Sequence, residues 1–194
     1  MESICVYCGS SDRVASVYLE SAARMGAAIA SRGLHLWYGA GSTGLMGAVA
    51  NGALQAGGEV TGVIPAIFNT PQLAHMNLTS LEVVESMHAR KMRLATAADG
   101  FAALPGGYGT FEEFFEILTW SQIGLHAKPI GLLNAGGYFD PLLDMIEHAR
   151  QEGFIYNEHQ ALFLSASVPD DLLDEMLEYV PPEGLDRWLS RAEE

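Results

Sequence analysis

Short apolar segments alternate with longer helix-like segments along almost the whole chain, and several of the apolar segments end at a glycine or proline. Strands that alternate with helices predict a parallel sheet, because each parallel connection must cross back over the sheet. We therefore expect a Rossmann-like, doubly wound α/β fold with a mainly parallel sheet and helices on both faces. The predicted strands cover residues 4–8, 34–38, 60–64, 81–85, 100–104, 129–133 and 162–163. The predicted helices cover residues 17–31, 87–98, 110–123, 138–151 and 169–180, and one more opens in a glycine loop at 39–47.

The chain has 194 residues, 49% of them hydrophobic, which suits one globular domain with an adequate core. We expect a single nucleotide-binding α/β domain over residues 1–180 and an acidic, peripheral tail over 181–194. Residues 66–80 show no clean period and are expected to form a long functional loop. No apolar run approaches the ~20 residues of a membrane span, and the N-terminus shows no signal-peptide pattern, so we expect a cytoplasmic protein.

The segment LPGGYGTFEE at residues 104–113 predicts an anion site. A predicted strand ends at its glycines and a helix begins at Thr110, so unpaired backbone N–H groups and the helix dipole point at one place. Glycines let the backbone close around a phosphate without clashes of Cβ atoms. The residues expected to grip the phosphate are 107–110.

Glu113, in the first turn of that helix, has two interpretations. It can complete a capping box with Thr110, in which it only satisfies a backbone donor. It can instead be a catalytic carboxylate held close to a bound phosphosugar. The helix is expected to turn the stripe Phe111, Phe114, Phe115 and Leu118 to the core, which places Glu113 and Glu116 on the opposite face.

A basic cluster begins the helix predicted at 87–98. The net charge is −14 and only ten residues are Lys or Arg, yet Arg90, Lys91 and Arg93 lie together. Such an acidic chain is not expected to bind nucleic acid. Cations at a helix N-terminus oppose the helix dipole, so an anionic ligand would relieve the conflict. The alternative is an ordinary solvated helix face.

The loop GAGSTG at residues 39–44 matches the dinucleotide fingerprint GxGxxG, which suggests a nicotinamide oxidoreductase. That fingerprint also requires an acidic residue at the end of the following strand to hold the ribose. The following strand ends in Ile64, Pro65 and Ala66, and the loop follows the second strand instead of the first. We expect these glycines to accommodate a nucleotide directly or to pack a helix on a strand.

Other kinds of site are not supported. The histidines are scattered without a metal-binding motif, and no Gly-x-Ser-x-Gly nucleophile elbow occurs. Cys5 and Cys8 fall on a predicted buried strand and are expected to be two buried thiols. A pyridoxal-phosphate enzyme would need Lys91 or Lys128 as its Schiff base, and Lys128 starts a strand at the wrong end of the sheet.

Two motifs together resemble a known family: PGGxGTxxE at residues 105–113, preceded by MHxRK at residues 87–91. They are similar to those of the LOG (Lonely Guy) family, the cytokinin riboside 5′-monophosphate phosphoribohydrolases. The similarity spans roughly residues 3–165 and includes CGS at 8–10, the 39–47 loop and TWSQxGxHxKP at 119–129. Many members have been labelled lysine decarboxylases, a label that the two available lysines disfavour.

The resemblance implies a homodimer without metal or organic cofactor. It also implies hydrolysis of an AMP-type nucleotide, either AMP or an N6-modified cytokinin nucleotide, to free base and ribose 5-phosphate. Arg90 and Glu113 match the family's catalytic pair. Gln72 falls where related chains often carry a glutamate, which leaves the substrate preference open. The positions that match substrate contacts are Gly9, Ser10, Gly44, Met87, Lys91, Gly106, Gly107, Gly109, Thr110, Glu112 and Thr119.

Two other functions remain as alternatives. A non-catalytic nucleotide sensor or carrier would need the phosphate-binding turn but not the pair Arg90 and Glu113. A dehydrogenase would need a complete dinucleotide fingerprint. The presence of both motifs favours the hydrolase.

Overall fold

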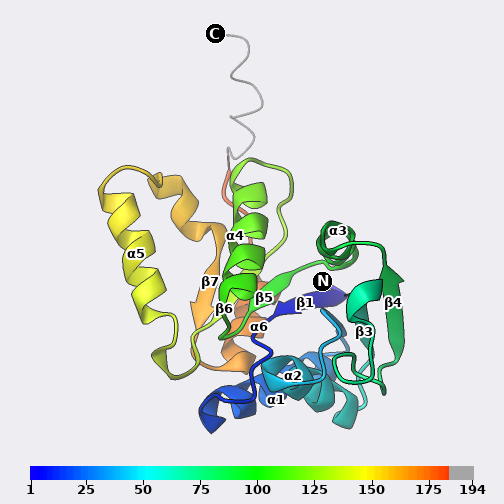
Figure 1. Ribbon diagram of the computed structural model, residues 1–194. Helices are drawn as coiled ribbons and strands as arrows, with labels where there is room; N and C mark the ends of the chain where they lie inside the picture. The colour runs from blue at the N-terminus through cyan, green and yellow to red at the C-terminus, as the bar shows by residue number, and fades with distance from the viewer. Residues whose placement is uncertain (184–194) are drawn as a thin grey trace.

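The computed structural model describes residues 1–183 and shows a seven-stranded sheet in which every strand pair is parallel. The strand order is β4-β3-β2-β1-β5-β6-β7, so the predicted doubly wound α/β fold is confirmed (Figure 1). The strands are β1 (Ser3–Tyr7), β2 (His35–Tyr38), β3 (Val60–Pro65), β4 (Ser80–Val84), β5 (Phe101–Ala103), β6 (Ile130–Leu133) and β7 (Leu164–Ala166).

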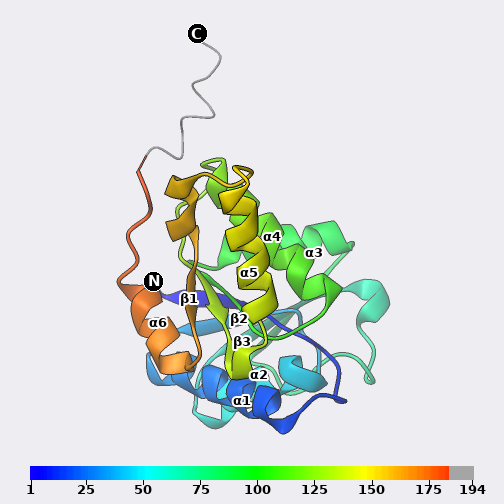
Figure 2. The same cartoon turned by 90° about the vertical axis from the view of Figure 1, so that its left-hand side faces the viewer.

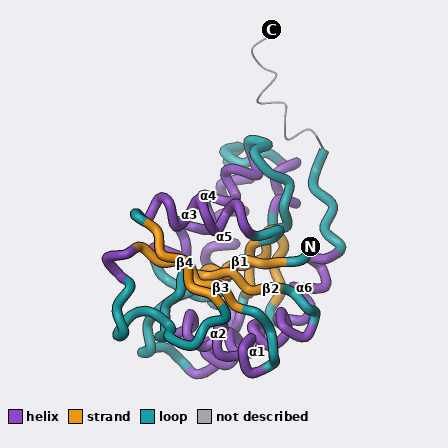
Figure 3. Tube along the Cα trace, turned by 90° about the vertical axis from the view of Figure 1, so that its right-hand side faces the viewer, coloured by secondary structure: helices purple, strands orange, loops and turns teal. Residues whose placement is uncertain are grey.

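Helices cover both faces of this sheet. One layer consists of α1, α2 and α6, and the other consists of α3, α4 and α5 (Figures 1 and 2). Figure 3 shows the strands lying between the two layers, with β4 at one edge of the sheet. The helices are α1 (Ser16–Ser31), α2 (Gly44–Gln55), α3 (Met87–Ala97), α4 (Tyr108–Gln122), α5 (Asp140–Gln151) and α6 (Pro169–Leu177), with 3₁₀ helices η1 (Ala66–Phe68), η2 (Ala135–Gly137) and η3 (Asn157–Leu162).

The apolar runs form strands because both faces of the sheet are covered. All residues of β1, β3, β5 and β6 are buried, as expected for parallel strands between two helical layers. The alanine-rich sequences of α1 and α2 let these helices pack very closely. A Cβ on Gly26 would lie 2.0 Å from the carbonyl oxygen of Val49, so this contact excludes any side chain.

The chain changes direction along the sheet between β1 and β5. From β1 it proceeds through β2 and β3 to β4 on one side, then crosses to β5 on the other side of β1. The loops after β1 and β5 therefore lead to opposite helical layers and leave a crevice between them. The glycine turn predicted as an anion site follows β5, so the topology places it at this crevice.

Several element boundaries differ from the sequence-based expectation. β7 begins at Leu164 instead of 162, because residues 157–162 form η3. Leu162 is buried, but as the last residue of this 3₁₀ helix and not as part of a strand. α5 begins at Asp140 instead of 138, because Gly136 and Gly137 adopt φ of 59° and 71° and turn the chain first. α6 ends at Leu177 rather than 180. Most of the expected tail, residues 184–194, lies outside the described residues.

Candidate functional site

The glycine turn after β5 is held by the loop that follows β1. The Gly9 N–H donates to the carbonyl oxygen of Pro105 at 3.0 Å. Gly106 packs tightly, since a Cβ there would lie 2.1 Å from the Thr110 hydroxyl oxygen and 2.9 Å from the Gly9 nitrogen. The two loops at the crevice are therefore fixed against each other before any ligand binds.

The N-terminus of α4 presents free backbone donors. The helix begins at Tyr108, its N-cap residue Gly107 makes no side-chain cap, and no residue among 1–183 accepts from the N–H groups of 107–110. Gly107 and Gly109 are exposed, and a Cβ added to either would meet no other atom within 4 Å. This arrangement has the geometry of an anion site at a helix N-terminus.

The N-terminus of α2, which carries the dinucleotide-like loop, is already occupied by the protein itself. The Gly44 N–H donates to a carboxylate oxygen of Asp12 at 2.7 Å, and those of Leu45 and Met46 donate to the Gly9 carbonyl at 3.0 and 3.2 Å. A dinucleotide phosphate would have to displace Asp12. The N–H of Gly44, one of the predicted substrate contacts, is thus engaged within the chain.

The capping-box interpretation of Glu113 is wrong. Helix α4 starts two residues earlier than predicted, so Thr110 lies inside its first turn and packs under Gly106. Glu113 is 8% exposed, and its carboxylate accepts a hydrogen bond from Arg90. The expected placement on the solvent face is also wrong: Glu113 is buried whereas Phe115, assigned to the core stripe, is 39% exposed.

Arg90 and Glu113 form a nearly buried ion pair between α3 and α4. Arg90 Nη1 lies 2.8 Å from Glu113 Oε1, and the two side chains are only 12% and 11% exposed. Arg90 Nε also donates to the Val63 carbonyl in β3 at 3.2 Å. A Cβ on Gly39 would lie 1.8 Å from Arg90 Nη2, so the first glycine of the dinucleotide-like loop makes room for this arginine.

The carboxyl of Glu113 experiences two opposing influences. Burial raises its pKa above 4.5 by penalising the charged form, and the adjacent Arg90 guanidinium partly offsets this effect. A carboxylate with a raised pKa can exchange a proton more readily near neutral pH than an ordinary one. The thiols of Cys5 and Cys8 are buried and free, as predicted, and burial raises their pKa values far above that of an ordinary cysteine.

The rest of the basic cluster is also paired with carboxylates. Lys91 Nζ donates to Glu112 and, at 2.9 Å, to Glu116, both on α4. Arg93 makes a two-point contact with Glu82 at 2.6 and 2.7 Å. The chain's own carboxylates thus pair with the positive charges for which an anionic ligand was expected.

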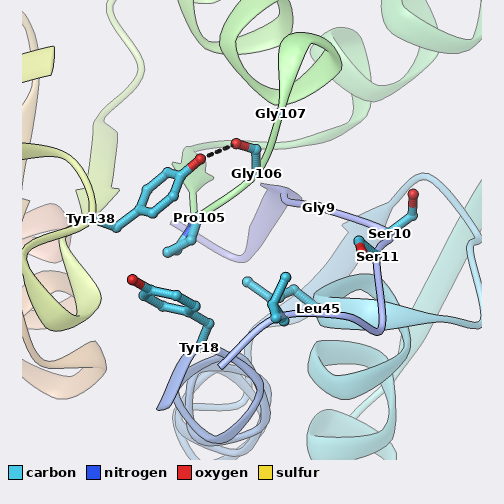
Figure 4. A pocket seen from close by; sticks show the side chains of 10 residues that line it. Gly9, Ser10, Ser11, Tyr18, Leu45, Pro105, Gly106, Gly107 and Tyr138 are labelled. Carbon is cyan, nitrogen blue, oxygen red and sulfur yellow. Dashed lines mark hydrogen bonds between the residues drawn. The ribbon is translucent and has the colours of Figure 1, made fainter. Parts of the chain in front are cut away.

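A hollow of about 350 Å³ opens beside the glycine turn (Figure 4). Four of the predicted contact residues line it: Gly9, Ser10, Gly106 and Gly107. Tyr138, which no sequence motif singled out, also lines it and donates from its hydroxyl to the Gly106 carbonyl. The pair of glycines before Tyr138 marks a turn, but nothing in the sequence links Tyr138 to Gly106.

Other predicted contacts lie elsewhere around this region. The Met87 sulfur lies 3.3 Å from Arg90 Nη1. Thr119 is exposed on α4, nine residues beyond Thr110 and therefore about 13 Å farther along the helix axis. Gln72 is exposed in the predicted functional loop, whose residue Leu73 accepts hydrogen bonds from Ser42. One copy of the chain does not bring Thr119 to the turn.

The two lysines have structural partners. Lys91 is held by the carboxylates described above, and Lys128 Nζ donates to the carbonyls of Ala95 and Ala98 at 2.8 and 2.6 Å. Lys128 therefore satisfies carbonyl groups at the end of α3. Neither amine projects freely into the crevice, which argues against a Schiff-base enzyme.

Residues 1–183 contain no group of three or more His, Cys, Asp and Glu side chains placed to hold a metal ion. None of the helices in this part of the chain is long and apolar enough to cross a bilayer. The absence of a cofactor remains a prediction.

Comparison with known proteins relates this chain to enzymes by sequence. A protein family described as "Possible lysine decarboxylase" matches residues 46–176. The cytokinin riboside 5′-monophosphate phosphoribohydrolase of Rhodococcoides fascians is 53% identical over 155 residues, which are 79% of this chain and 78% of that protein. The enzyme of the same name, LOG, from Oryza sativa subsp. japonica is 43% identical over 178 residues, 92% of this chain and 73% of that protein.

A solved structure supports the fold. The molybdenum cofactor binding protein from Rippkaea orientalis superposes with a TM-score of 0.70 over 91% of this chain and 95% of that one, at 22% identity. At that identity, the likeness concerns the fold alone.

Proposed function

The chain belongs to the family of the cytokinin riboside 5′-monophosphate phosphoribohydrolases, and on that premise we propose that it hydrolyses the N-glycosidic bond of an adenosine 5′-monophosphate-type nucleotide. The products are the free base and ribose 5-phosphate. The observation that carries the proposal is the buried pair of Arg90 and Glu113 beside an uncapped helix N-terminus.

The glycine turn anchors the substrate through its phosphate. The free N–H groups of 107–110 and the dipole of α4 bind the phosphate oxygens, and the bare Cα atoms of Gly107 and Gly109 let them approach. Binding energy gained at the phosphate holds the ribose in position, so that the reaction at C1′ becomes effectively intramolecular. Gly9 supports the turn from the neighbouring loop through its hydrogen bond to Pro105, and Gly106 supports it from within.

The reaction breaks the C1′–N9 bond and forms a C1′–O bond to water. Positive charge builds on the ribose in an oxocarbenium-like transition state, and the base leaves with the electron pair of the broken bond and is protonated. We assign to Glu113 the roles of orienting and deprotonating the water and of stabilising the cation. Its raised pKa suits proton transfer near neutral pH. Arg90 holds Glu113 in place and offsets negative charge on the phosphosugar or the departing base.

The ion pairs around this centre fix its two helices. Lys91 joins α3 to α4 through Glu112 and Glu116, on the same two helices that carry Arg90 and Glu113. We propose that Lys91 and Glu112 also contact the substrate, and that contacts with the substrate then replace part of the ion pairing of Lys91. Met87 contributes its thioether beside Arg90.

We also propose a cytoplasmic homodimer. Exposed apolar side chains on and after α3 and α4 offer an interface, among them Met92 at 55%, Phe115 at 39% and Leu125 at 61% exposure. Thr119 is exposed on the same helix as Phe115. In the proposed dimer, Thr119 of one copy would therefore contact the substrate that is bound to the other copy. The free thiols of Cys5 and Cys8 suit a reducing compartment.

The test is product analysis. The protein is incubated with AMP and with N6-isopentenyl-AMP, and free base and ribose 5-phosphate are quantified by chromatography, with and without a chelator. We expect both products in equal amounts and no effect of the chelator. Tight nucleotide binding without products would instead support a carrier, and products that vanish with chelator and return with a divalent ion would refute the metal-free reaction.

A further inference from the structure

The hydroxyl of Tyr138 donates a hydrogen bond to the carbonyl oxygen of Gly106 (Figure 4). Gly106 lies in the middle of the glycine turn, and its neighbour Pro105 accepts the hydrogen bond from Gly9. Two successive carbonyl groups of the turn are thus fixed from outside, one by the loop after β1 and one by Tyr138.

This contact also determines where an N–H group points. The Gly106 carbonyl and the Gly107 N–H belong to one planar peptide unit, and no peptide bond in the described chain is cis. In a trans peptide these two groups point in opposite directions. A carbonyl that is held toward Tyr138 therefore turns the Gly107 N–H away from Tyr138. In Figure 4, Ser10 and Ser11 lie on that other side of the turn.

The Tyr138 ring is itself held rigidly. Gly136 and Gly137 take φ of 59° and 71°, and the Asn134 side chain then accepts from the Phe139 N–H at 2.7 Å. The ring packs edge-on against Tyr18, with centroids 5.6 Å apart and planes at 75°. A hydroxyl placed this firmly loses little conformational entropy when it makes its bond.

We propose that Tyr138 is a positioning residue for phosphate binding: it orients the Gly106–Gly107 peptide so that the Gly107 N–H is aimed at the anion site. The inference rests on the proposed role of the turn in holding the substrate phosphate. The role assigned to Tyr138 requires no contact with the substrate or the reacting atoms. Its effect passes through one backbone peptide, which predicts a defect specific for phosphate.

The test compares Tyr138→Phe with Tyr18→Phe. Both variants lose one hydroxyl from the same hollow and keep the ring, but no hydrogen-bond partner of the Tyr18 hydroxyl occurs among residues 1–183. Affinity for ribose 5-phosphate and for inorganic phosphate is measured by calorimetry, which needs no turnover. Tyr138→Phe should bind both about 3- to 10-fold more weakly, the range for one hydrogen bond, and Tyr18→Phe should stay within about twofold of wild type.

Kinetics provide the second readout. In Tyr138→Phe, kcat/KM for the 5′-monophosphate should fall by the same factor, while kcat/KM for the nucleoside should stay unchanged and the melting temperature should fall by no more than a few degrees, the cost of one hydrogen bond. A general structural defect would lower activity on both substrates. Unchanged phosphate affinity in Tyr138→Phe, or an equal loss in Tyr18→Phe, would overturn the inference. If the wild type binds ribose 5-phosphate but cleaves no nucleotide, the proposed function fails, and the calorimetric comparison still decides the role of Tyr138.

Discussion

The Glu113 carboxyl lies in surroundings that disfavour its charged form. It is buried against Arg90, and its pKa is raised because the cost of burial exceeds the attraction of the guanidinium. Positions of this kind occur where function, and not stability, selects the residue. Two consequences can be measured, one in catalysis and one in folding.

Glu113→Gln should lower kcat by roughly 10²–10⁴, the range for loss of acid–base catalysis. The amide can still accept the Arg90 hydrogen bond, so nucleotide affinity should change little. Steady-state kinetics and nucleotide titration measure the two effects. Glu116→Gln, one turn later and partly exposed in its pairing with Lys91, is the matched control and should be close to wild type. Full turnover in a folded Glu113→Gln protein would remove Glu113 from the mechanism.

The same substitution should change how stability depends on pH. A folded-state pKa above the unfolded value of 4.5 means that the native protein binds this proton more tightly than the unfolded chain. The stabilising contribution of protonated Glu113 is therefore complete below pH 4.5 and is lost as pH rises through the folded-state pKa. The Glu113→Gln variant has no titrating group at this position and therefore does not lose this contribution. The difference between its melting temperature and that of the wild type should increase as the pH rises from 4.5 through the folded-state pKa. A relative melting temperature that falls with increasing pH would contradict the raised pKa.

At the scale of elements, α2 and α4 begin after similar glycine loops but use their N-termini differently. Asp12 and the Gly9 carbonyl take up the first donors of α2, whereas those of α4 have no acceptor among residues 1–183. Asp12→Ala should therefore reduce the free energy of unfolding by about 0.5–2 kcal/mol, the cost of losing a helix cap. Denaturant titration measures this, and Asp12→Asn, which keeps an acceptor oxygen, should lose less. Equal stability of Asp12→Ala and wild type would show that the cap contributes nothing.

Local sequence signals predicted the strands and most helices because each apolar run and each glycine turn acts within a few residues. They misplaced Glu113 because its burial depends on Arg90, which reaches it from α3 after the two helices pack together. The partners of Lys91 were missed for the same reason. The error at β7 arose because Leu162 and Phe163 are apolar enough for a strand, but Leu162 belongs to the 3₁₀ helix formed by residues 157–162. The hydrogen bond of Tyr138 joins residues 32 positions apart and has no local signature.

At the scale of the whole molecule, the proposed site is incomplete in one copy, because Thr119 lies far along α4 from the turn. Light scattering should give twice the mass of the single chain. Phe115→Asp, which places a charge in the exposed apolar surface, should shift the mass toward the monomer while the melting temperature stays close to wild type. A wild-type monomer at assay concentration would contradict the proposed dimer.

The central claim is that a phosphate-binding turn at the β1–β5 crevice presents a nucleotide to Arg90 and Glu113. The most direct test is the ratio of kcat/KM for AMP to that for adenosine, measured on the same preparation by release of adenine. Since the phosphate supplies the anchoring energy, the account predicts that AMP is cleaved at least 10²-fold more efficiently, equivalent to about 2.7 kcal/mol of transition-state binding. Comparable values for AMP and adenosine would contradict it.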